Sequence, residues 1–341
     1  MMPYRMRFTV PEDVPMCVAM EPTHFGCSDA NQEEACRWLG TLLAKGRALS
    51  AVVVNEQDEP VAFGLTLFIS DEFRQFLLSE HNQQLIGQRL RQFCTPRTIL
   101  ALLGIERGHR GEGLNMVGFY GWREELPEAD LAAVRSLLYA SFPYLHAGYH
   151  LKSFLKEVYG AQEAAMYTQM GFTVHKQPSD YPLPRRALEP YLMGVVRGEV
   201  SFPARAADLF QGTSPPIELK RRYREVGQLA YMMRLDDGEI TQCLGLTDNA
   251  LYNLWSRLGR RLNGNSEHPN SRFGRRGCLR VIAECPAIIY PLSVHTRFYH
   301  CPERARRYPL PLQERVLSPP AARWANAHER GLEGVQVVQG A

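Results

Sequence analysis

The chain has 341 residues, of which 45% are hydrophobic and 10% aromatic, and its formal net charge is +3. This composition supports a buried core, and the length predicts two domains. No run reaches the ~18 to 20 consecutive apolar residues that span a bilayer, and residues 1–7 have no apolar signal core behind their basic side chains, so the sequence predicts a cytoplasmic protein without a membrane partner.

The eight cysteines include no Cys-x-x-Cys pair, which argues against a disulfide framework. A group of histidines and cysteines toward the carboxyl end lacks the paired short intervals of structural zinc modules, so we predict no metal site there. This group consists of His268, Cys278, Cys285, His295, His300 and Cys301.

Strand and helix patterns alternate within residues 1–180. Runs typical of strands fall at 6–10, 50–54, 61–69 and 114–120. Helical periodicity falls at 31–44 and 128–142, and a further helix opens at Pro11-Glu12-Asp13. The polar residues 55–60 predict a hairpin between the second and third strands.

Residues 158–172 contain a helix pattern that includes Tyr167 and is followed by Gly171-Phe172. With the order of strands and helices, this element resembles the GNAT acetyltransferase fold, in which a strand is followed by a helix ending in Tyr and then Gly-Phe. The resemblance implies an α+β domain, a mixed sheet flanked by helices, over residues 1–180. It also implies that Tyr167 is the candidate general acid toward a departing thiolate.

An alternative to this element is a longer helix, because the apolar residues before it also fit one helical face. These residues are Leu151, Phe154, Leu155 and Val158. A Tyr followed by Gly-Phe is also common where any helix ends and a strand begins.

The GNAT resemblance also implies a loop, Gln/Arg-x-x-Gly-x-Gly/Ala, whose backbone N–H groups hold the pyrophosphate of acetyl-CoA at a helix N-terminus. The nearest segment, 110–115, ends in Asn115 instead of a small residue, carries Glu112, and is followed by a strand pattern. We therefore predict a degraded site with no cofactor and no catalysis. In the alternative of an active acetyl-CoA-dependent N-acyltransferase, the residues would be Arg110, Gly111, Gly113, Asn115 and Tyr167.

Prolines crowd residues 181–216, which predicts an extended linker with at most one short helix or strand near 191–196. A last segment, 291–341, is rich in Pro, Arg and Gly, and we expect a C-terminal extension whose end is mobile.

Residues 236–258 predict two short helices joined by a glycine turn, which is the pattern of a helix-turn-helix. Asp236 or Asp237 can cap the first helix, Gly245 supplies the turn, and Thr247 can cap the second helix. The second helix has an apolar stripe formed by Leu251, Leu254, Trp255 and Leu258.

The spacing of Glu239-Ile240-Thr241, Leu244, Leu246-Thr247 and Ala250-Leu251 resembles the LuxR-type DNA-binding domain. Glu225-Val226 in the preceding helix and Arg260-Arg261-Leu262 after the second helix match further elements of that family. The resemblance implies an all-α helix-turn-helix domain over residues 217–290.

Between Lys220 and Arg280 the chain has twelve basic and six acidic residues, an excess that suits contact with phosphates. The alternative is a helical hairpin without a nucleic-acid role. The predicted DNA-binding residues are Thr247, Asp248, Asn249, Tyr252, Asn253, Ser256, Arg257, Arg260 and Arg261.

The sequence thus predicts a transcriptional regulator of double-stranded DNA, in which the GNAT-like domain senses a small-molecule effector or dimerises. We expect a homodimer, with Leu279, Val281 and Ile282 on a candidate dimer helix. Two alternatives stay open. One is an active acyltransferase that carries a helix-turn-helix, and the other is a sigma-factor-like module that contacts promoter DNA alongside RNA polymerase.

Overall fold

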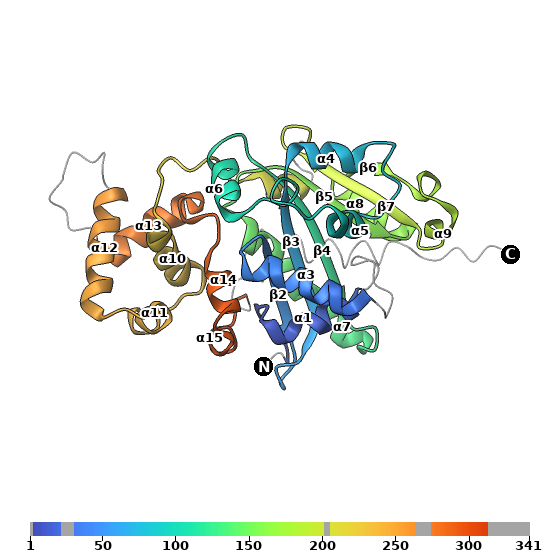
Figure 1. The fold of residues 1–341 in the computed structure, drawn as a ribbon. Coiled ribbons are helices and arrows are strands. Elements are labelled where there is room, and N and C mark those ends of the chain that lie inside the picture. Colours follow the sequence, from blue (N-terminus) through green and yellow to red (C-terminus); the bar gives the residue numbers. More distant parts are fainter. Residues whose placement is uncertain (1–2, 22–30, 201–204, 263–273, 313–341) are drawn as a thin grey trace.

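The computed structural model describes residues 3–21, 31–200, 205–262 and 274–312. Figure 1 shows a broad sheet with helices on both of its faces and a separate group of helices beside one end of the sheet. The sheet belongs to the amino-terminal part of the chain, and the group of helices begins with α10 (Arg221–Gly227).

Within the described residues, seven strands form one mixed sheet in the order β1-β2-β3-β4-β5-β7-β6. The pair β4–β5 is parallel, and the other neighbouring pairs are antiparallel. The strands are β1 (Arg5–Phe8), β2 (Ala48–Val54), β3 (Pro60–Ile69), β4 (Leu114–Trp122), β5 (Leu151–Tyr159), β6 (Thr173–Lys176) and β7 (Pro190–Val196).

Helices cover both faces of the sheet because successive side chains of a strand point to opposite sides. Phe63, Leu65 and Leu67 of β3 pack with α1 (Val14–Met20) and α3 (Gln32–Ala44). Ala62 and Phe68 of the same strand belong to the core on the other face, which is covered by α7 (Glu128–His146). The predicted succession of strands and helices, including α8 (Ala161–Gln169) before β6, is confirmed.

Three helices between β3 and β4 are additions to the predicted pattern. They are α4 (Asp71–Leu78), α5 (Ile86–Gln92) and α6 (Leu102–Arg110). Each of the first two buries apolar side chains in the same core as α1 and α3, as Phe73 and Ile86 show. The sequence did not predict them because each is only seven to nine residues long, too short for a clear periodic pattern.

The predicted linker, 181–216, is not an extended connector throughout. β7 lies inside it and pairs with β5 on one side and β6 on the other, so the sheet extends to Val196 and not to residue 180. Pro190 is the first residue of β7, a position where a strand tolerates the missing N–H group. Two short elements, α9 (Leu183–Arg186) and the 3-10 helix Arg205–Phe210, occupy other parts of this segment.

The helical part packs directly on the sheet domain. Its elements are α10, the π-helical turn Gln228–Met232, α11 (Asp237–Leu244), α12 (Asp248–Leu262), α13 (Arg275–Glu284), the 3-10 helix Pro286–Ile289, α14 (Val294–Tyr299) and α15 (Pro302–Arg307). Val226, Ile289 and Phe298 share one hydrophobic core with Phe68 and Leu138 of the sheet domain. The two parts are therefore joined by a continuous apolar interior.

The described part of the predicted C-terminal extension, residues 291–312, is folded. Val294 and Phe298 of α14 are fully buried, and the N–H of Leu310 donates to the carbonyl oxygen of Met6 in β1 at 2.7 Å. The extension therefore packs on the sheet domain near the first strand (Figure 1). The end for which we expect mobility falls in 313–341, outside the described residues.

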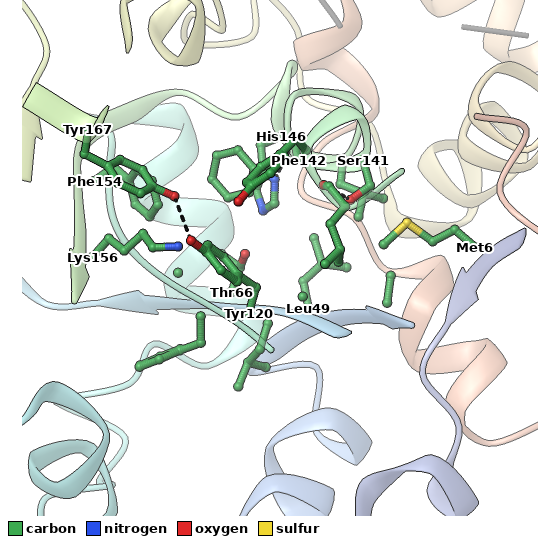
Figure 2. Close-up of a pocket in the computed structure, with 18 residues that line it drawn as sticks. Met6, Leu49, Thr66, Tyr120, Ser141, Phe142, His146, Phe154, Lys156 and Tyr167 are labelled. Atoms are coloured by element: carbon green, nitrogen blue, oxygen red, sulfur yellow. Dashed lines mark hydrogen bonds between the residues drawn. The ribbon is translucent and has the colours of Figure 1, made fainter. Parts of the chain in front are cut away.

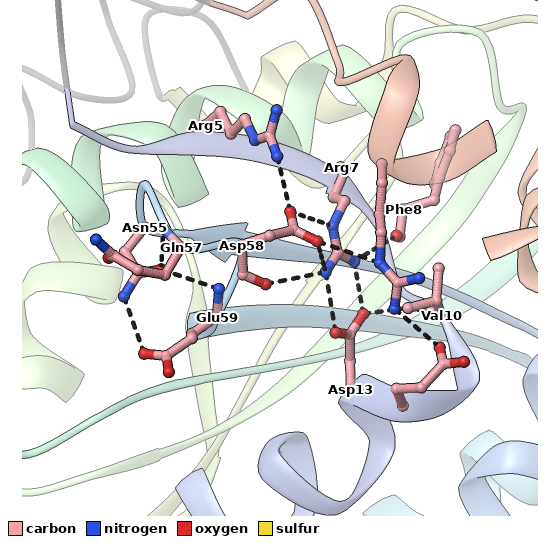
Figure 3. Close-up of polar contacts among 11 residues, drawn as sticks. Arg5, Arg7, Phe8, Val10, Asp13, Asn55, Gln57, Asp58 and Glu59 are labelled. Carbon is pink, nitrogen blue, oxygen red and sulfur yellow. Dashed lines mark hydrogen bonds and ion pairs between the residues drawn. The ribbon is translucent and has the colours of Figure 1, made fainter. Parts of the chain in front are cut away.

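A buried arginine ties the first strand to its surroundings (Figure 3). Arg7 in β1 is 1% exposed, and its guanidinium forms ion pairs with Asp13 at 2.6 Å and with Asp58 at 3.0 Å. Arg306 of α15 reaches the other oxygen of Asp58 at 3.3 Å. Asp58 therefore links β1, the β2–β3 hairpin and the C-terminal extension.

No single helix in the described part of the chain is long and apolar enough to cross a membrane. The segments Arg275–Glu284 and Pro286–Tyr299 meet that criterion only together, and they are bent by 114° at the break between them. Among the described residues, no group of three or more His, Cys, Asp or Glu side chains could hold a metal ion.

Candidate functional site

The two helices of the predicted helix-turn-helix pattern are α11 and α12. Asp236, and not Asp237, caps α11: its carboxylate accepts the N–H of Glu239 at 2.8 Å, while the Glu239 side chain accepts the N–H of Asp236 at 2.9 Å. Gly245 adopts the left-handed conformation, with φ 61°. The hydroxyl of Thr247 then accepts the N–H of Ala250 at 3.2 Å at the start of α12. The short turn follows from these capping contacts.

The inner face of α12 is anchored in the helical part of the chain. Leu251, Trp255 and Leu258 are buried, and the indole N–H of Trp255 donates to Asp237 at 3.1 Å. Arg275 of α13 forms an ion pair with the same carboxylate at 2.9 Å. Asp237 therefore connects α11, α12 and α13.

The outer face of α12 is polar and lies on the side of the molecule away from the sheet (Figure 1). All nine residues that the sequence predicts to contact DNA are exposed: Thr247 just before α12, and Asp248, Asn249, Tyr252, Asn253, Ser256, Arg257, Arg260 and Arg261 on it. Tyr252 is 63% exposed, the Asn253 amide lies 3.5 Å from the Asn249 amide oxygen, and Arg261 lies over the ring of Tyr223. The structure thus gathers the predicted residues on one accessible surface.

Several of the basic residues counted from the sequence are used inside the protein. Arg224 is buried and forms an ion pair with Glu106 of α6. Glu225 is 2% exposed at its side chain and is paired with Arg221 at 3.0 Å and with Arg297 at 2.9 Å. Glu106, from a distant segment, thus neutralises one of the counted arginines, and Arg272 lies outside the described residues.

The segment predicted as a dimer helix is α13, and part of its apolar face packs inside its own chain. Ile282 of α13 is fully buried in the core of its own chain, and Leu279 and Val281 pack partly buried against that core. Ile282 is therefore covered by its own chain and cannot contact a second copy, while the dimer itself stays a prediction.

A second candidate site lies where β4 and β5 separate. The two strands pair only from Leu114 with Leu151 to Gly118 with Lys156, although β4 continues to Trp122 and β5 to Tyr159. Beyond that point each strand pairs only with its other neighbour. An open cleft of about 480 Å³ lies there, lined by Tyr120, Trp122, Arg135, Tyr159, Gly160, Ala161, Gln162, Glu163, Met166 and Glu189.

Figure 2 shows the polar groups at the inner end of this separation. The hydroxyl of Tyr120 donates to the carboxylate of Glu163, and the hydroxyl of Tyr167 lies 3.5 Å from that of Tyr120. The ammonium of Lys156 rests on the face of the Tyr120 ring, 3.0 Å from its centre. Lys156 is 4% exposed.

Burial dominates the electrostatics of this cluster. It lowers the pKa of Lys156 to about 7, against the attraction of Glu163 and Glu21. It raises the pKa of Glu21 to about 7 and that of the Tyr167 hydroxyl well above its ordinary value. Each of these pKa values is therefore shifted toward the neutral form of its group, because the low-polarity surroundings solvate a charge poorly.

The structure separates the two parts of the acyl-transfer site that the GNAT resemblance implies. Tyr167 does lie in the helix before Gly171-Phe172, and its ring packs edge-on against Phe172. The loop 110–115 lies at the opposite end of β4, where the strand begins. There Arg110 pairs with Glu218, and the Asn115 amide donates to Asp71 at 2.7 Å.

The segment that follows β4 and leads into a helix is 123–127, before α7. It reads Arg-Glu-Glu-Leu-Pro and contains no glycine. Glu124 and Glu125 are exposed there, and their charge would repel a pyrophosphate at the helix N-terminus. The segment 123–127 therefore lacks the glycines of the Gln/Arg-x-x-Gly-x-Gly/Ala pattern, and the loop 110–115 lies at the other end of β4.

Lys156, Glu163 and Glu21 were not identified from the sequence. One signal was present, because Lys156 and Glu157 are adjacent charged residues in β5 between the apolar pairs Phe154-Leu155 and Val158-Tyr159. Glu157 is also buried, its carboxylate accepts the N–H of Ile86 at 3.1 Å, and burial raises its pKa to about 8. The pattern did not show which of the two charges faces a cleft.

No protein-family model matches the sequence, and no curated protein sequence matches it. Among solved structures, the chain is similar to an acetyltransferase of the GNAT family from Streptococcus pneumoniae, with 13% identity and a TM-score of 0.32, over 57% of this chain and 99% of that one. It is similar to a GNAT phosphinothricin acetyltransferase from Sinorhizobium meliloti in complex with AcCoA, with 12% identity and a TM-score of 0.33, over 59% and 91% of the two chains.

A third similar structure is a spermidine/spermine N-acetyltransferase from Vibrio cholerae, with 12% identity and a TM-score of 0.34, over 58% of this chain and 95% of that one. The amino-terminal domain has the mixed sheet flanked by helices that the sequence predicts for it. This is a statement about its fold alone.

Proposed function

We propose that this chain is a sequence-specific DNA-binding regulator and that α12 is its recognition helix. The observation that carries the proposal is the division of α12 into a buried anchor and an outer face of exposed Asn, Tyr, Ser and Arg side chains. These residue types suit the major groove, where Asn pairs with adenine and Arg with guanine or phosphate. A helix held by Trp255 and its partner Asp237 would keep those side chains in a constant orientation.

The position of each residue along α12 suggests its role. Asn249, Tyr252 and Asn253 lie in the first half of the helix, which in this motif contacts base edges. Arg257, Arg260 and Arg261 lie in the second half, where phosphate contact would add affinity without base preference. Asp248 does not suit a phosphate and would be tolerated only where its carboxylate accepts from a base such as cytosine.

Tight specific binding by such a small module calls for two copies on two half-sites about one helical turn apart, ~34 Å. Because α13 is packed in its own chain, the sheet domain is the part we assign to dimerisation and to sensing an effector. Contact with RNA polymerase belongs to the sigma-factor-like alternative, which predicts binding to promoter DNA only together with polymerase.

The test is to select DNA fragments with the purified full chain in the absence of polymerase and to sequence them. Asn253→Ala should flatten the base preference at one position, a loss of ~1 to 3 kcal/mol of discrimination. Arg260→Ala should weaken binding to all sequences about equally. It should also reduce the slope of log affinity against log salt concentration by about one. The matched control is Arg97→Ala, which removes an exposed arginine from the sheet domain and should change neither property.

The proposal fails if the wild type selects no common sequence. It also fails if Asn249→Ala combined with Asn253→Ala leaves both the preferred sequence and the affinity unchanged. Selection that requires added polymerase would favour the sigma-factor-like alternative.

Acyl transfer is the second function to consider, and the observation that favours it is the Tyr167 hydroxyl, which lies 3.5 Å from the hydroxyl of Tyr120. The acidic segment 123–127 and the distant loop 110–115 count against it, because the pyrophosphate of acetyl-CoA needs backbone N–H donors and a helix N-terminus together. We therefore propose that the GNAT-like domain is retained without acetyl-CoA-dependent catalysis.

A further inference from the structure

The chain contains five lysines, and two of them are buried. The ammonium of Lys176 is solvated by the protein, because it donates to the carbonyl oxygens of Ser79 at 2.7 Å and Asn82 at 2.6 Å. Lys156 has no such hydrogen bonds within the described residues. Its ammonium contacts ring faces instead, 3.0 Å from the centre of Tyr120 and 4.9 Å from that of Tyr167. The two lysines are therefore equally buried but differ in what stabilises their charge.

A mostly apolar pocket of about 60 Å³ adjoins Lys156 (Figure 2). Leu138, Phe142 and Phe154 contribute to its walls. One buried water takes roughly 10 to 15 Å³ of such space, so the pocket has room for a small organic group of a few atoms. Tyr120 borders both this pocket and the outer cleft of about 480 Å³, so the two spaces lie on either side of one side chain.

The pocket also contains an unused polar atom. His146 is 3% exposed, its Nδ1 lies 2.7 Å from the carbonyl oxygen of Phe142, and its Nε2 has no hydrogen-bond partner in the described structure. Burial lowers the pKa of His146 to about 4, so the ring is neutral near pH 7 and Nε2 is an acceptor. An occupant with a hydroxyl or N–H group would satisfy it.

Two carboxyl groups stand near the amine. Glu163 accepts from the Tyr120 hydroxyl and from the N–H of Tyr159 at 3.3 Å, and Glu21 interacts electrostatically with Lys156. These groups disfavour an anionic ligand in the inner pocket. Because burial brings the pKa of Lys156 to about 7, its neutral fraction near pH 7 is about a thousandfold that of an ordinary exposed lysine. A neutral amine is a nucleophile.

We propose that Lys156 is a carbonyl-reactive residue that forms a Schiff base with a small, neutral aldehyde or ketone entering from the β4–β5 cleft. The Nζ lone pair forms a bond to the carbonyl carbon, and the C=O electron pair moves to oxygen. Glu163, hydrogen-bonded to Tyr120, carries one proton from nitrogen to that oxygen, which gives the carbinolamine, and then carries the second nitrogen proton to the resulting hydroxyl. The C–O bond breaks, C=N forms and one water leaves. No oxidant or reductant is consumed, and this inference does not rest on the proposed DNA binding.

The experiment treats the full chain with limiting propionaldehyde and cyanoborohydride at neutral pH and maps the propylated lysines by mass spectrometry. Cyanoborohydride traps the imine as a secondary amine. We expect Lys156 to be labelled at least ~10-fold faster than the exposed Lys45 and Lys220, as its neutral fraction requires. Lys176 is the matched buried control and should stay unlabelled. Labelling of Lys45 and Lys220 with Lys156 unmodified, or labelled at their rate, would overturn the proposal.

Variants separate the chemistry from accessibility. Glu163→Gln should slow labelling at Lys156 and leave the rates at Lys45 and Lys220 unchanged, and an unchanged rate at Lys156 would remove Glu163 from the proton transfer. Lys176→Met should leave Lys156 labelling as it is in the wild type. Circular dichroism checks that both variants are folded, and the wild-type labelling pattern decides the main claim without either of them.

Discussion

The imidazole Nε2 of His109 lies 3.0 Å from the carbonyl oxygen of Ala287, and this hydrogen bond joins α6 of the sheet domain to the 3-10 helix after α13. The other ring nitrogen, Nδ1, accepts the N–H of His150 at 3.0 Å. Because Nδ1 accepts, the ring is neutral and Nε2–H is the donor to Ala287. His109 is fully buried, so the contact between the two parts of the chain depends on a histidine that carries no charge.

Acid should weaken this junction. Burial is the main cause that lowers the pKa of His109 to about 4, whereas an unfolded histidine has a pKa of ~6.5. Between these values the unfolded chain binds a proton that the folded protein does not, so the free energy of unfolding falls as the pH drops from about 6.5 to 4. The buried His146 and His295 act in the same direction. Urea denaturation at several pH values measures the slope. We expect His109→Gln to reduce it, and an unchanged slope would contradict the assignment.

Arg7 should be more important for stability than the exposed arginine beside it. Arg7→Met leaves Asp13 buried without its partner, and breaking a buried ion pair on one side costs ~3 to 5 kcal/mol. Arg5→Ala is the control, because Arg5 is 42% exposed at its side chain and shares Asp58, so its loss should cost within ~1 kcal/mol. The measurement is the free energy of unfolding in urea. Equal losses in the two variants would show that burial does not decide the difference.

The turn before α12 should depend on the conformation of Gly245. Its φ of 61° is left-handed and no atom within 4 Å would contact an added Cβ, so substitution has only a backbone cost. Gly245→Ala should destabilise by ~1 to 2 kcal/mol, and Gly245→Asn by less, because Asn tolerates this conformation better. Thermal unfolding of the full chain compares them. A larger loss for Asn than for Ala would indicate a role other than conformation.

Acetyl-CoA should not bind the GNAT-like domain. The loop 110–115 and the cleft lie at opposite ends of β4, and the segment before α7 is acidic. We expect millimolar acetyl-CoA to leave the melting temperature unchanged and Tyr167→Phe to leave DNA binding intact. Micromolar binding by calorimetry that disappears in Arg110→Ala would instead support the acyltransferase.

Local patterns were sufficient to predict much of the sheet domain and the helices α11 and α12. The hairpin 55–60, the helix at 128–142 and the turn at Gly245 depend on neighbouring residues, so period and capping chemistry predict them. The nine exposed residues of α12 followed from the same periodicity, because the helix has a buried stripe that fixes the opposite face. Their contact with DNA stays a prediction.

Tertiary structure decided what depends on residues far apart in the sequence. β7 is a strand despite its proline-rich surroundings because β5 and β6 pair with it on both sides, and that pairing outweighs the local turn propensity. Glu106 pairs inside the protein with Arg224, one of the twelve basic residues that the count treated as available for phosphate contact. The sequence alone determined the succession of elements in the sheet domain apart from α4, α5, α6 and β7, and it determined the polar face of α12. Only the tertiary structure decided which charged residues are buried. The contact of the Lys156 ammonium with the Tyr120 ring beside a cleft depends on the separation of β4 and β5 in the folded sheet.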